Sequence, residues 1–193
     1  MSNAFKRSIF ALALMAMALA SCEPVPENVF TRRFVIKEGS HYSTPRLAEM
    51  LQSNRLRFEA TFDQSAIYDF NDQAMQTNKN KLMGFADCNS MHHENSARFG
   101  WQWYNNQLEI YAYCYVNGNR VEEFLGTVQP GVVNNYEIEL TADAYVFYLN
   151  NEQITSIGRS VDCDKGAYYL LYPYFGGSLP APHDVTIDIT MIR

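Results

Sequence analysis

Residues 95–122 constrain the fold more than any other part of the chain. Their sequence, NSARFGWQWYNNQLEIYAYCYVNGNRVE, alternates apolar and polar side chains around two turn-forming pairs, Asn105-Asn106 and Asn117-Gly118. Asn and Gly tolerate the positive φ angles that two-residue hairpin turns require. The segment therefore predicts three antiparallel strands joined by two tight turns.

Two-residue turns also fix the register of the three strands, with Tyr104 opposite Gln107 and Tyr115 opposite Arg120. One face is then apolar and carries Ala97, Phe99, Trp101, Trp103, Leu108, Ile110, Ala112 and Cys114. The opposite face, called the tyrosine face below, carries Ser96, Arg98, Gly100, Gln102, Glu109, Tyr111, Tyr113, Tyr115, Arg120 and Glu122. Glu123 would fall on the apolar face, so we expect a β-bulge near it.

The rest of the chain reads as further short strands at even spacing. Charged residues make up only 19% and aromatic residues 14%, a mixture rich in strand-forming side chains. We expect an all-β fold, a two-sheet antiparallel β-sandwich of the jelly-roll type. Residues 44–52 predict its one short helix, with Thr44 as N-cap and Pro45 in the first turn. Strands are expected at residues 30–36, 55–62 (continuing over 66–70), 81–87, 132–140, 144–149, 152–157, 167–175 and 184–192, and loops at 71–80 and 88–94.

The N-terminus has the features of a targeting segment. Lys6-Arg7 precede an apolar stretch over residues 9–20, which is too short to span a bilayer. Leu19-Ala20-Ser21-Cys22 resembles a bacterial lipobox, which implies cleavage after residue 21 and lipid modification of Cys22. We expect a signal peptide at 1–21, a lipidated tether at 22–28 and the sandwich at 29–193, placing the protein in the bacterial cell envelope, anchored to a membrane. An ordinary cleaved signal is the alternative.

Three cysteines remain inside the predicted domain, so they cannot all pair with one another. Cys114 lies on the apolar face, which favours a buried free thiol. A disulfide from Cys88 or Cys163 to Cys114 is the alternative in an oxidising compartment. No Cys/His spacing typical of structural zinc is present.

The formal net charge of −6, without a cluster of Lys and Arg in the sequence, argues against nucleic acid as a partner. The tyrosine face instead favours a glycan, because sugars present C–H faces that stack on aromatic rings and hydroxyls that need polar partners. The predicted binding residues are Asn95, Arg98, Gln102, Tyr111, Tyr113, Tyr115 and Arg120, with Tyr168, Tyr172 and Tyr174 as candidates from a neighbouring strand. The alternatives are a solvent-exposed sheet face without a ligand and a surface that docks a protein.

No cofactor is expected. A structural calcium ion is the alternative, held by Asp184 or Asp188 at the last predicted strand, because carboxylate oxygens are ligands that calcium prefers. Adjacent histidines on a strand point to opposite faces, so His92 and His93 are poorly placed to bind one metal ion together.

Residues 135–154, NYEIELTADAYVFYLNNEQI, resemble a hairpin common in concanavalin A-like lectins and glucanases. The resemblance implies two curved antiparallel sheets with a concave face that often binds oligosaccharides. Retaining glycosidases of this superfamily carry an E-x-D-x-(x)-E run on one strand. Neither residues 59–63 nor residues 137–139 reproduce it, so hydrolysis by two carboxylates is not expected.

A polysaccharide lyase that acts by β-elimination is the enzymatic alternative to simple binding. Its candidate residues are His93, Arg98 and Tyr113, which could supply a cation and an acid–base pair. Jelly-roll alginate lyases carry R-x-E-L-R, Q-(I/V)-H and Y-F-K-x-G-x-Y motifs. The chain is similar to the first and third only in part, at residues 98–103 and 172–178, and has no Q-(I/V)-H. We therefore expect glycan binding without turnover.

Overall fold

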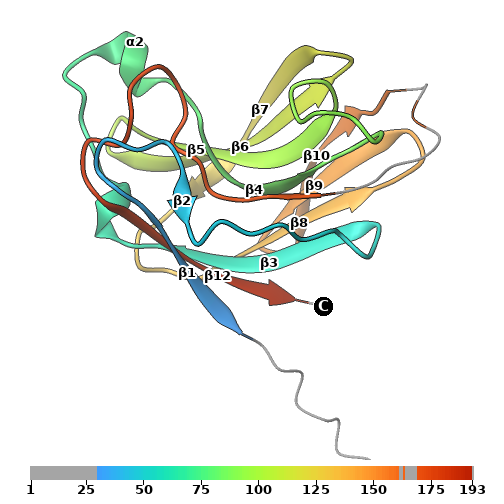
Figure 1. Cartoon of the computed structure of the whole chain (residues 1–193), viewed down its shortest axis with the longest axis horizontal. Helices are drawn as coiled ribbons and strands as arrows, with labels where there is room; N and C mark the ends of the chain where they lie inside the picture. The colour runs from blue at the N-terminus through green and yellow to red at the C-terminus, as the bar shows by residue number, and fades with distance from the viewer. Residues whose placement is uncertain (1–29, 161–162, 164–168, 193) are drawn as a thin grey trace, which may run out of the picture.

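The computed structural model describes residues 30–160, 163 and 169–192, and these residues form two antiparallel sheets packed face to face (Figure 1). The seven-stranded sheet has the order β10 (Glu152–Gly158), β9 (Ala144–Leu149), β8 (Asn134–Leu140), β3 (Arg55–Phe62), β12 (Val185–Ile192), β1 (Thr31–Ile36) and β2 (Ser43–Thr44). The five-stranded sheet has the order β11 (Leu170–Leu171), β4 (Asn80–Ala86), β5 (Ser96–Tyr104), β6 (Gln107–Val116) and β7 (Asn119–Val128). The predicted all-β sandwich is confirmed.

The register predicted for the three central strands is confirmed along its full length. Tyr104 pairs with Gln107 and Tyr115 with Arg120, and Asn105, Asn106 and Asn117 have φ angles of 50°, 58° and 50°. The expected bulge lies where the β6–β7 register shifts between Ile110 and Tyr111. Glu123 precedes this bulge on the edge strand β7, where it is exposed and its carboxylate accepts a hydrogen bond from Thr155 of β10.

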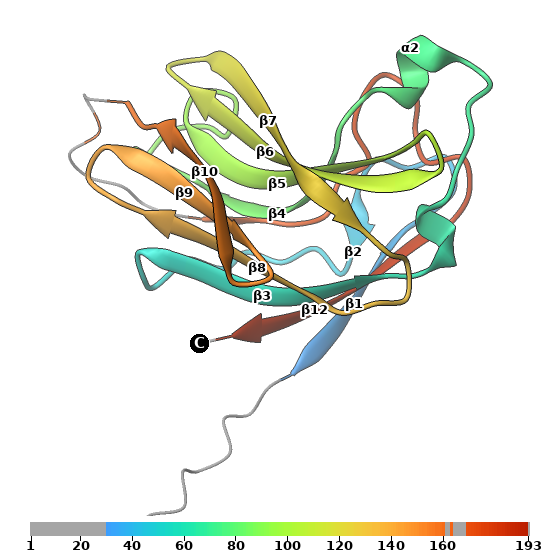
Figure 2. The same cartoon turned by 180° about the vertical axis from the view of Figure 1, so that it is seen from behind.

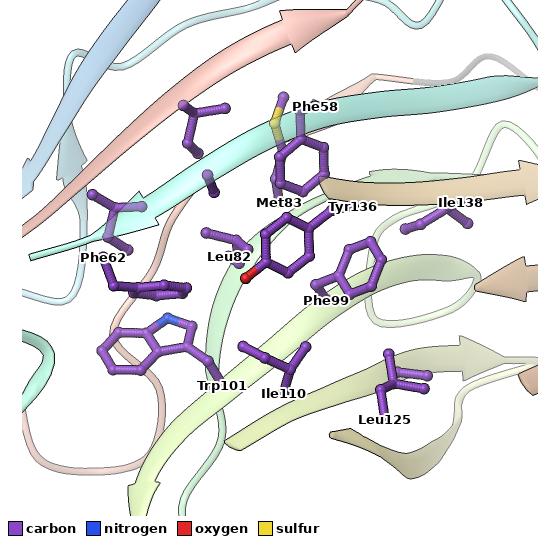
Figure 3. Close-up of a cluster of buried hydrophobic side chains, with 14 of the residues drawn as sticks. Phe58, Phe62, Leu82, Met83, Phe99, Trp101, Ile110, Leu125, Tyr136 and Ile138 are labelled. Carbon is purple, nitrogen blue, oxygen red and sulfur yellow. The ribbon is translucent and has the colours of Figure 1, made fainter. Parts of the chain in front are cut away.

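The core lies between the two sheets and is rich in aromatic rings (Figure 3). Phe58 and Tyr136 of the seven-stranded sheet stack with their ring centres 5.2 Å apart. Phe99 of β5 meets both rings edge-on, at 5.9 and 5.1 Å. This burial uses the apolar face of the central strands and leaves the tyrosine face on the outside of the five-stranded sheet.

The five-stranded sheet curves so that its outer face is concave, and the loop that carries α2 (Gln73–Gln76) rises at one end of it (Figure 1, Figure 2). Asp72 caps α2 by accepting hydrogen bonds from the backbone of Ala74 and Met75. This short helix lies in a segment predicted as a loop. No helix among the described residues is long and apolar enough to cross a membrane.

Three predicted elements were wrong, and in each the tertiary contacts override local propensity. Residues 45–52 do not form a helix. Thr44 belongs to β2 and pairs with Val35 of β1, and the Glu49 carbonyl accepts a hydrogen bond from the backbone of Leu170. The expected strand continuation over residues 66–70 is replaced by a 3-10 turn, Gln64–Ala66, capped by Asp63. The strand expected over 167–175 is reduced, within the described residues, to β11 and single bridges.

Candidate functional site

A continuous row of paired residues crosses the tyrosine face at right angles to the strands. Phe124 of β7 pairs with Tyr111 of β6, which pairs with Gly100 of β5. Beyond Gly100 the pairing continues through β4 and two isolated bridges. The full row is Phe124, Tyr111, Gly100, Lys81, Tyr174 and Tyr42.

The row is open to solvent at both ends and low in the middle. Phe124 and Tyr42 are each 55% exposed. A Cβ atom at Gly100 would lie 3.3 Å from the Tyr113 Cβ and 3.5 Å from the Tyr111 Cβ, so glycine keeps the centre free of a side chain. The row therefore offers aromatic rings on either side of a central floor that a ligand can approach closely.

Two lysines extend over the tyrosine rings of the face. The Lys79 ammonium lies 4.2 Å from the centre of the Tyr111 ring, and the Lys81 ammonium lies 4.4 Å from the centre of the Tyr113 ring. Both distances fall within the range of cation–π attraction. The backbone of Lys81 is held by reciprocal hydrogen bonds with Tyr174, of 2.8 and 3.0 Å.

Arg98 lies beside these lysines and is only 5% exposed. Its guanidinium carbon is 5.7 Å from the centre of the Tyr113 ring, and no group in the described part of the chain accepts a hydrogen bond from its Nε. Its aliphatic stem crosses Gly84 of β4, where a Cβ atom would lie 2.5 Å from the Arg98 Cγ. Glycine at residue 84 is thus required for Arg98 to pack into the sheet face.

Burial and mutual repulsion disfavour the charged forms of these cations. Burial lowers the pKa of Arg98 from its usual value. Burial and then the nearby Arg98 charge lower the pKa of Lys81 to about 8. Burial also lowers the pKa of Lys79. A cation kept at such a cost is expected at a functional site more often than at a structural one.

Tyr113 is a buried ring beneath the cations rather than an exposed stacking surface, because it is only 4% exposed. Burial, followed by its hydrogen bond with Tyr115, raises the pKa of Tyr113 to about 12, so its hydroxyl stays protonated at neutral pH. Arg120, at the exposed edge, forms an ion pair with Glu122 at 3.0 Å. Among the predicted binding residues, Tyr111, Tyr115 and Arg120 are the ones with accessible side chains.

Gln102 is buried and fully used within the protein. Its side-chain oxygen accepts a hydrogen bond from Lys79 at 2.9 Å, and its amide nitrogen donates to Glu109 at 2.5 Å. The Tyr111 hydroxyl donates to the same Glu109 carboxylate at 2.7 Å. Gln102 therefore positions Lys79 and Tyr111 rather than contacting a ligand itself.

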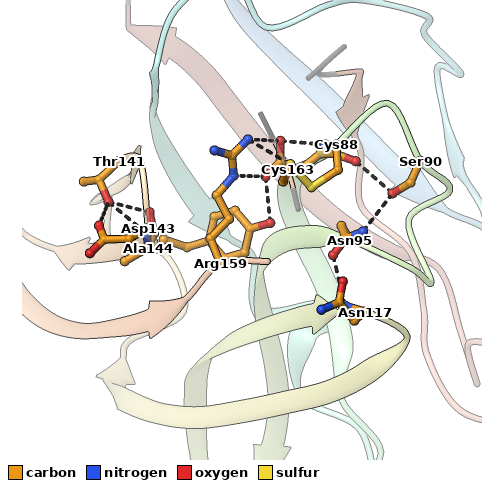
Figure 4. Close-up of polar contacts among 11 residues, drawn as sticks. Cys88, Ser90, Asn95, Asn117, Thr141, Asp143, Ala144, Arg159 and Cys163 are labelled. Atoms are coloured by element: carbon orange, nitrogen blue, oxygen red, sulfur yellow. Dashed lines mark hydrogen bonds and ion pairs between the residues drawn. A yellow bond between two sulfur atoms is a disulfide. The ribbon is translucent and has the colours of Figure 1, made fainter. Parts of the chain in front are cut away.

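Asn95 has a similar role at the adjoining loop 88–94 (Figure 4). Its amide nitrogen donates to Ser90 Oγ at 3.4 Å, and its oxygen accepts from the Asn117 backbone at 3.0 Å. A disulfide between Cys88 and Cys163 ties the start of this loop to a distant segment, and Cys114 is a buried free thiol. The free Cys114 is confirmed, whereas a disulfide to Cys114 was wrong.

A buried ion pair reinforces the base of the loop (Figure 4). Arg159 donates to both oxygens of Asp87 at 2.5 and 2.9 Å, and the Tyr145 hydroxyl donates to Asp87 at 2.8 Å. Arg159 also contacts the sulfur of Cys163 at 3.0 Å. Asp87 follows β4 directly, so this cluster fixes where β4 ends and loop 88–94 begins.

The two histidines of this loop lie next to the tyrosine face. Their ring centres are 4.2 Å apart, and His93 meets Tyr115 edge-on at 5.3 Å. Burial, followed by the nearby Arg98 charge, lowers the pKa of His92 to about 4, so it is neutral at pH 7. The candidate lyase residues His93, Arg98 and Tyr113 are thus brought together, with Tyr115 between His93 and Tyr113.

The candidate calcium ligands lie in β12 of the other sheet (Asp188) and directly before it (Asp184), and each forms an ion pair. Asp184 is 2.6 Å from Lys37, and Asp188 is 2.8 Å from Arg33. Within the described residues, the one group of three potential metal ligands is Asp87 with Cys88 and Cys163, whose sulfurs form the disulfide. The expectations about calcium and cofactors stay predictions.

A cavity of about 640 Å³ lies away from the tyrosine face. Its walls are formed by residues 49–53, the start of β3, Leu170 and the end of β12. It contains none of the charged and aromatic residues of the row. The tyrosine face is instead the concave outer surface of a sheet, along which an extended ligand can lie (Figure 1, Figure 2).

Sequence reasoning missed Lys79, Lys81, Phe124 and Tyr42. A signal existed for the lysines, because Lys79 and Lys81 are two residues apart and side chains at this spacing share one strand face. Tyr174 joins the row as anticipated. Tyr172 instead stacks on Phe34, with ring centres 5.5 Å apart, and Tyr168 lies outside the described residues.

No protein-family model matches the sequence, and no curated protein matches it. Solved structures do match the fold. The alginate lyase AlyC3 superposes with a TM-score of 0.56 at 8% identity, over 86% of this chain and 73% of that one. SCLam, a non-specific endo-β-1,3(4)-glucanase from family GH16, gives 0.55 at 10% identity, over 86% and 72%. The laminarinase catalytic domain from Thermotoga maritima MSB8 gives 0.54 at 10% identity, over 86% and 80%.

The fold is a concanavalin A-like jelly roll. The resemblance drawn from residues 135–154 is thus confirmed for the fold, and these residues form β8, β9 and the start of β10. Identities this low leave the function of the chain to be argued from its own residues.

Proposed function

We propose that the protein binds a polysaccharide on the tyrosine face, with the glycan chain following the row from Phe124 to Tyr42. The proposal rests on the arrangement of side chains along this row. Exposed rings at its two ends can stack on sugar C–H faces, and Gly100 keeps its centre low. The structures with a similar fold include an alginate lyase, a laminarinase and an endo-β-1,3(4)-glucanase, and these names support a polysaccharide as the ligand.

The dimensions of the row suit a polymer. Neighbouring strands lie about 4.8 Å apart, so the five steps from Phe124 to Tyr42 span about 24 Å. This is long enough for several sugar units in an extended chain. Tyr111 and Tyr174 lie along the path, and Arg120 and Tyr115 lie beside it.

A lyase activity is the second candidate function, because the structure brings Arg98, Tyr113 and His93 into one cluster. A two-carboxylate hydrolase has weaker support. The face carries Glu109 and Glu122, but Glu109 accepts hydrogen bonds from Gln102 and Tyr111, and Glu122 pairs with Arg120. Each of these carboxylates is thus already engaged by another side chain of the face.

The proposal is tested by affinity electrophoresis of the purified protein against a broad panel of polysaccharides, with calcium and with chelator. Retarded migration in at least one polysaccharide, with the polymer left intact, supports a binding module. Unsaturated chain ends that disappear in a His93→Ala variant support the lyase. If no polysaccharide retards the protein while a partner protein is retained from envelope extracts, the face docks a protein and the proposal fails.

We also propose that Cys22 anchors the domain to a membrane of the bacterial cell envelope. The support is the lipobox-like sequence Leu19-Ala20-Ser21-Cys22 after an apolar stretch. Two or more acyl chains give stable membrane attachment. Expression in a bacterial host with labelled palmitate tests this. The protein should be labelled and sediment with membranes, a Cys22→Ala variant should lose both properties, and labelling that survives the substitution would refute the anchor.

A further inference from the structure

The tyrosine face holds several cations that lack a carboxylate partner. Arg98 is buried, and its Nε has no hydrogen-bond partner in the described part of the chain. Lys81 is half-buried, and its ammonium donates to a neutral acceptor, the Lys79 carbonyl, at 2.7 Å. None of the ion pairs formed by the described residues includes Arg98, Lys79 or Lys81.

Burying a cation without a counter-charge is costly, and two adjacent buried cations repel each other as well. The nearest acids do not compensate for this. Glu122 is 3.0 Å from Arg120, and Glu109 accepts from Gln102 and Tyr111. The whole chain has a net charge of −6, so a cluster of unpaired positive charge on this face runs against its overall composition.

We propose that the ligand is an anionic polysaccharide, that the half-buried Lys81 receives its carboxylate or sulfate groups, and that the buried charge of the neighbouring Arg98 adds to the attraction. This rests on the proposed polysaccharide-binding function and names the ligand class for the same face. The Lys81 ammonium can donate charge-assisted hydrogen bonds to an oxyanion, and these are stronger than neutral ones. The adjacent Arg98 guanidinium adds positive potential at the same place. The ligand would thus provide the counter-charge that the protein lacks.

The position of Lys81 in the row explains how the anion would be placed. Lys81 lies between Gly100 and Tyr174, at the low centre of the row, so an anionic group on a sugar that follows the row reaches it there. The loop at Gly176 closes against Lys81 from the other side, since a Cβ atom at residue 176 would lie 2.8 Å from the Lys81 Nζ. The ammonium is thereby held over the face and not free to extend into solvent.

The test compares polymers that differ only in charge. Affinities of the purified protein are measured for polymannuronate, polyguluronate and polygalacturonate, each against its carboxyl-reduced counterpart, and for dextran sulfate against dextran. A single-stranded oligonucleotide serves as a polyanion that is not a glycan. The variants are Lys81→Met and Arg98→Met, with Lys37→Met, which removes one positive charge from an ion pair on the other sheet, as the matched control.

We expect at least one anionic polysaccharide to bind at least tenfold more tightly than its uncharged counterpart. Lys81→Met and Arg98→Met should each lose about tenfold or more of this affinity, and Lys37→Met should lose less than twofold. A uronate polymer as the best ligand assigns carboxylate, and dextran sulfate as the best ligand assigns sulfate; both support the proposal. Circular dichroism confirms that each variant is folded.

Two results would overturn the inference while leaving polysaccharide binding intact. The first is equal affinity for the charged and uncharged polymers. The second is binding of a uronate polymer that Lys81→Met and Arg98→Met, both folded, leave unchanged. An oligonucleotide that binds as tightly as the best polysaccharide would instead show a general polyanion surface and refute the glycan. Binding to none of the polymers would refute the proposed function itself.

Discussion

The Lys81 ammonium lies 4.4 Å from the centre of the Tyr113 ring, and the Arg98 guanidinium approaches the same ring at 5.7 Å. One buried tyrosine thus contacts two cations that have no carboxylate between them. The ring offers some attraction to both, but less than an ion pair would. This arrangement lowers the stability of the folded protein, and a bound anion would offset that loss. Substitutions of these cations should therefore affect stability and ligand binding in opposite directions.

Removing the Lys81 charge should stabilise the protein. Burial lowers the pKa of Lys81 to about 8 in the folded state, well below the ordinary value for lysine, so folding disfavours its charged form. Below pH 8 this penalty is fully present, and it fades as the pH rises toward the unfolded value. We expect Lys81→Met to raise the free energy of unfolding by about 1–3 kcal/mol at pH 7, measured by urea denaturation. A loss of more than about 1 kcal/mol would show that Lys81 is structural.

Binding of an anionic glycan should weaken as the pH rises through about 8. Lys81 then loses its proton, and with it the charge that attracts the anion. If the neutral form contributes no affinity, the association constant falls about tenfold between pH 7 and pH 9. A Lys81→Arg variant, which stays charged over this range, should show a flat profile.

Other titratable and charged groups around Lys81 also influence the pH dependence of binding. Those that face Lys81 are Lys79, His92, Arg98, Tyr113, Arg120 and Glu122. His92 titrates near pH 4, and Tyr113 near pH 12, so neither changes charge between pH 7 and pH 9. A decline that persists in Lys81→Arg would assign the titration to a group other than Lys81.

Phe124 should contribute to binding and very little to stability. Its ring is 55% exposed and meets Tyr111 edge-on at 5.5 Å, so its removal leaves no buried cavity. We expect Phe124→Ala to lower glycan affinity by about 1 kcal/mol, roughly fivefold, with a change of less than about 0.5 kcal/mol in the free energy of unfolding. Phe30→Ala is the matched control, because Phe30 is 69% exposed outside the tyrosine face. Equal losses of affinity in the two variants would contradict the placement of the glycan along the row.

The Cys88–Cys163 disulfide should stabilise both the fold and the face. It closes a loop across a sequence separation of 75 residues. A cross-link over a loop of this length contributes about 2–4 kcal/mol. A Cys88→Ser/Cys163→Ser variant should lose this amount, and reductant should lower the stability of the wild type similarly while leaving the variant unchanged. A reductant effect of the same size in the variant would mean that the disulfide is not its cause.

The central strands were predictable because the information is local. Two Asn-containing turns at a fixed spacing set the register, and the alternation of residues 96–116 then assigned every side chain to a face. The helix expected from Thr44 failed because its residues pair with Val35 and Leu170, which are distant in sequence. Capping residues reveal what a segment prefers alone, and these non-local contacts outweighed that preference.

The candidate site was only half visible in the sequence for the same reason. Arg98, Tyr111 and Arg120 lie on the central strands, so the register alone brings them together. Lys81 and Tyr42 reach the face through β4 and isolated bridges, whose pairing no local pattern specifies. The alternation also could not predict burial. Tyr113 and Gln102 point away from the core, but Lys81 lies over the Tyr113 ring and Lys79 donates a hydrogen bond to Gln102, so both residues are buried.

Nuclear magnetic resonance can show whether a polysaccharide lies along the row on the tyrosine face. Backbone amide shifts of the labelled protein are followed during titration with an oligosaccharide prepared from the best-binding polymer. The largest changes are predicted at Phe124, Tyr111, Gly100, Lys81 and Tyr174, in the order of the row across the strands. Changes concentrated instead around the cavity beside residues 49–53, or on the outer face of the seven-stranded sheet, would contradict it.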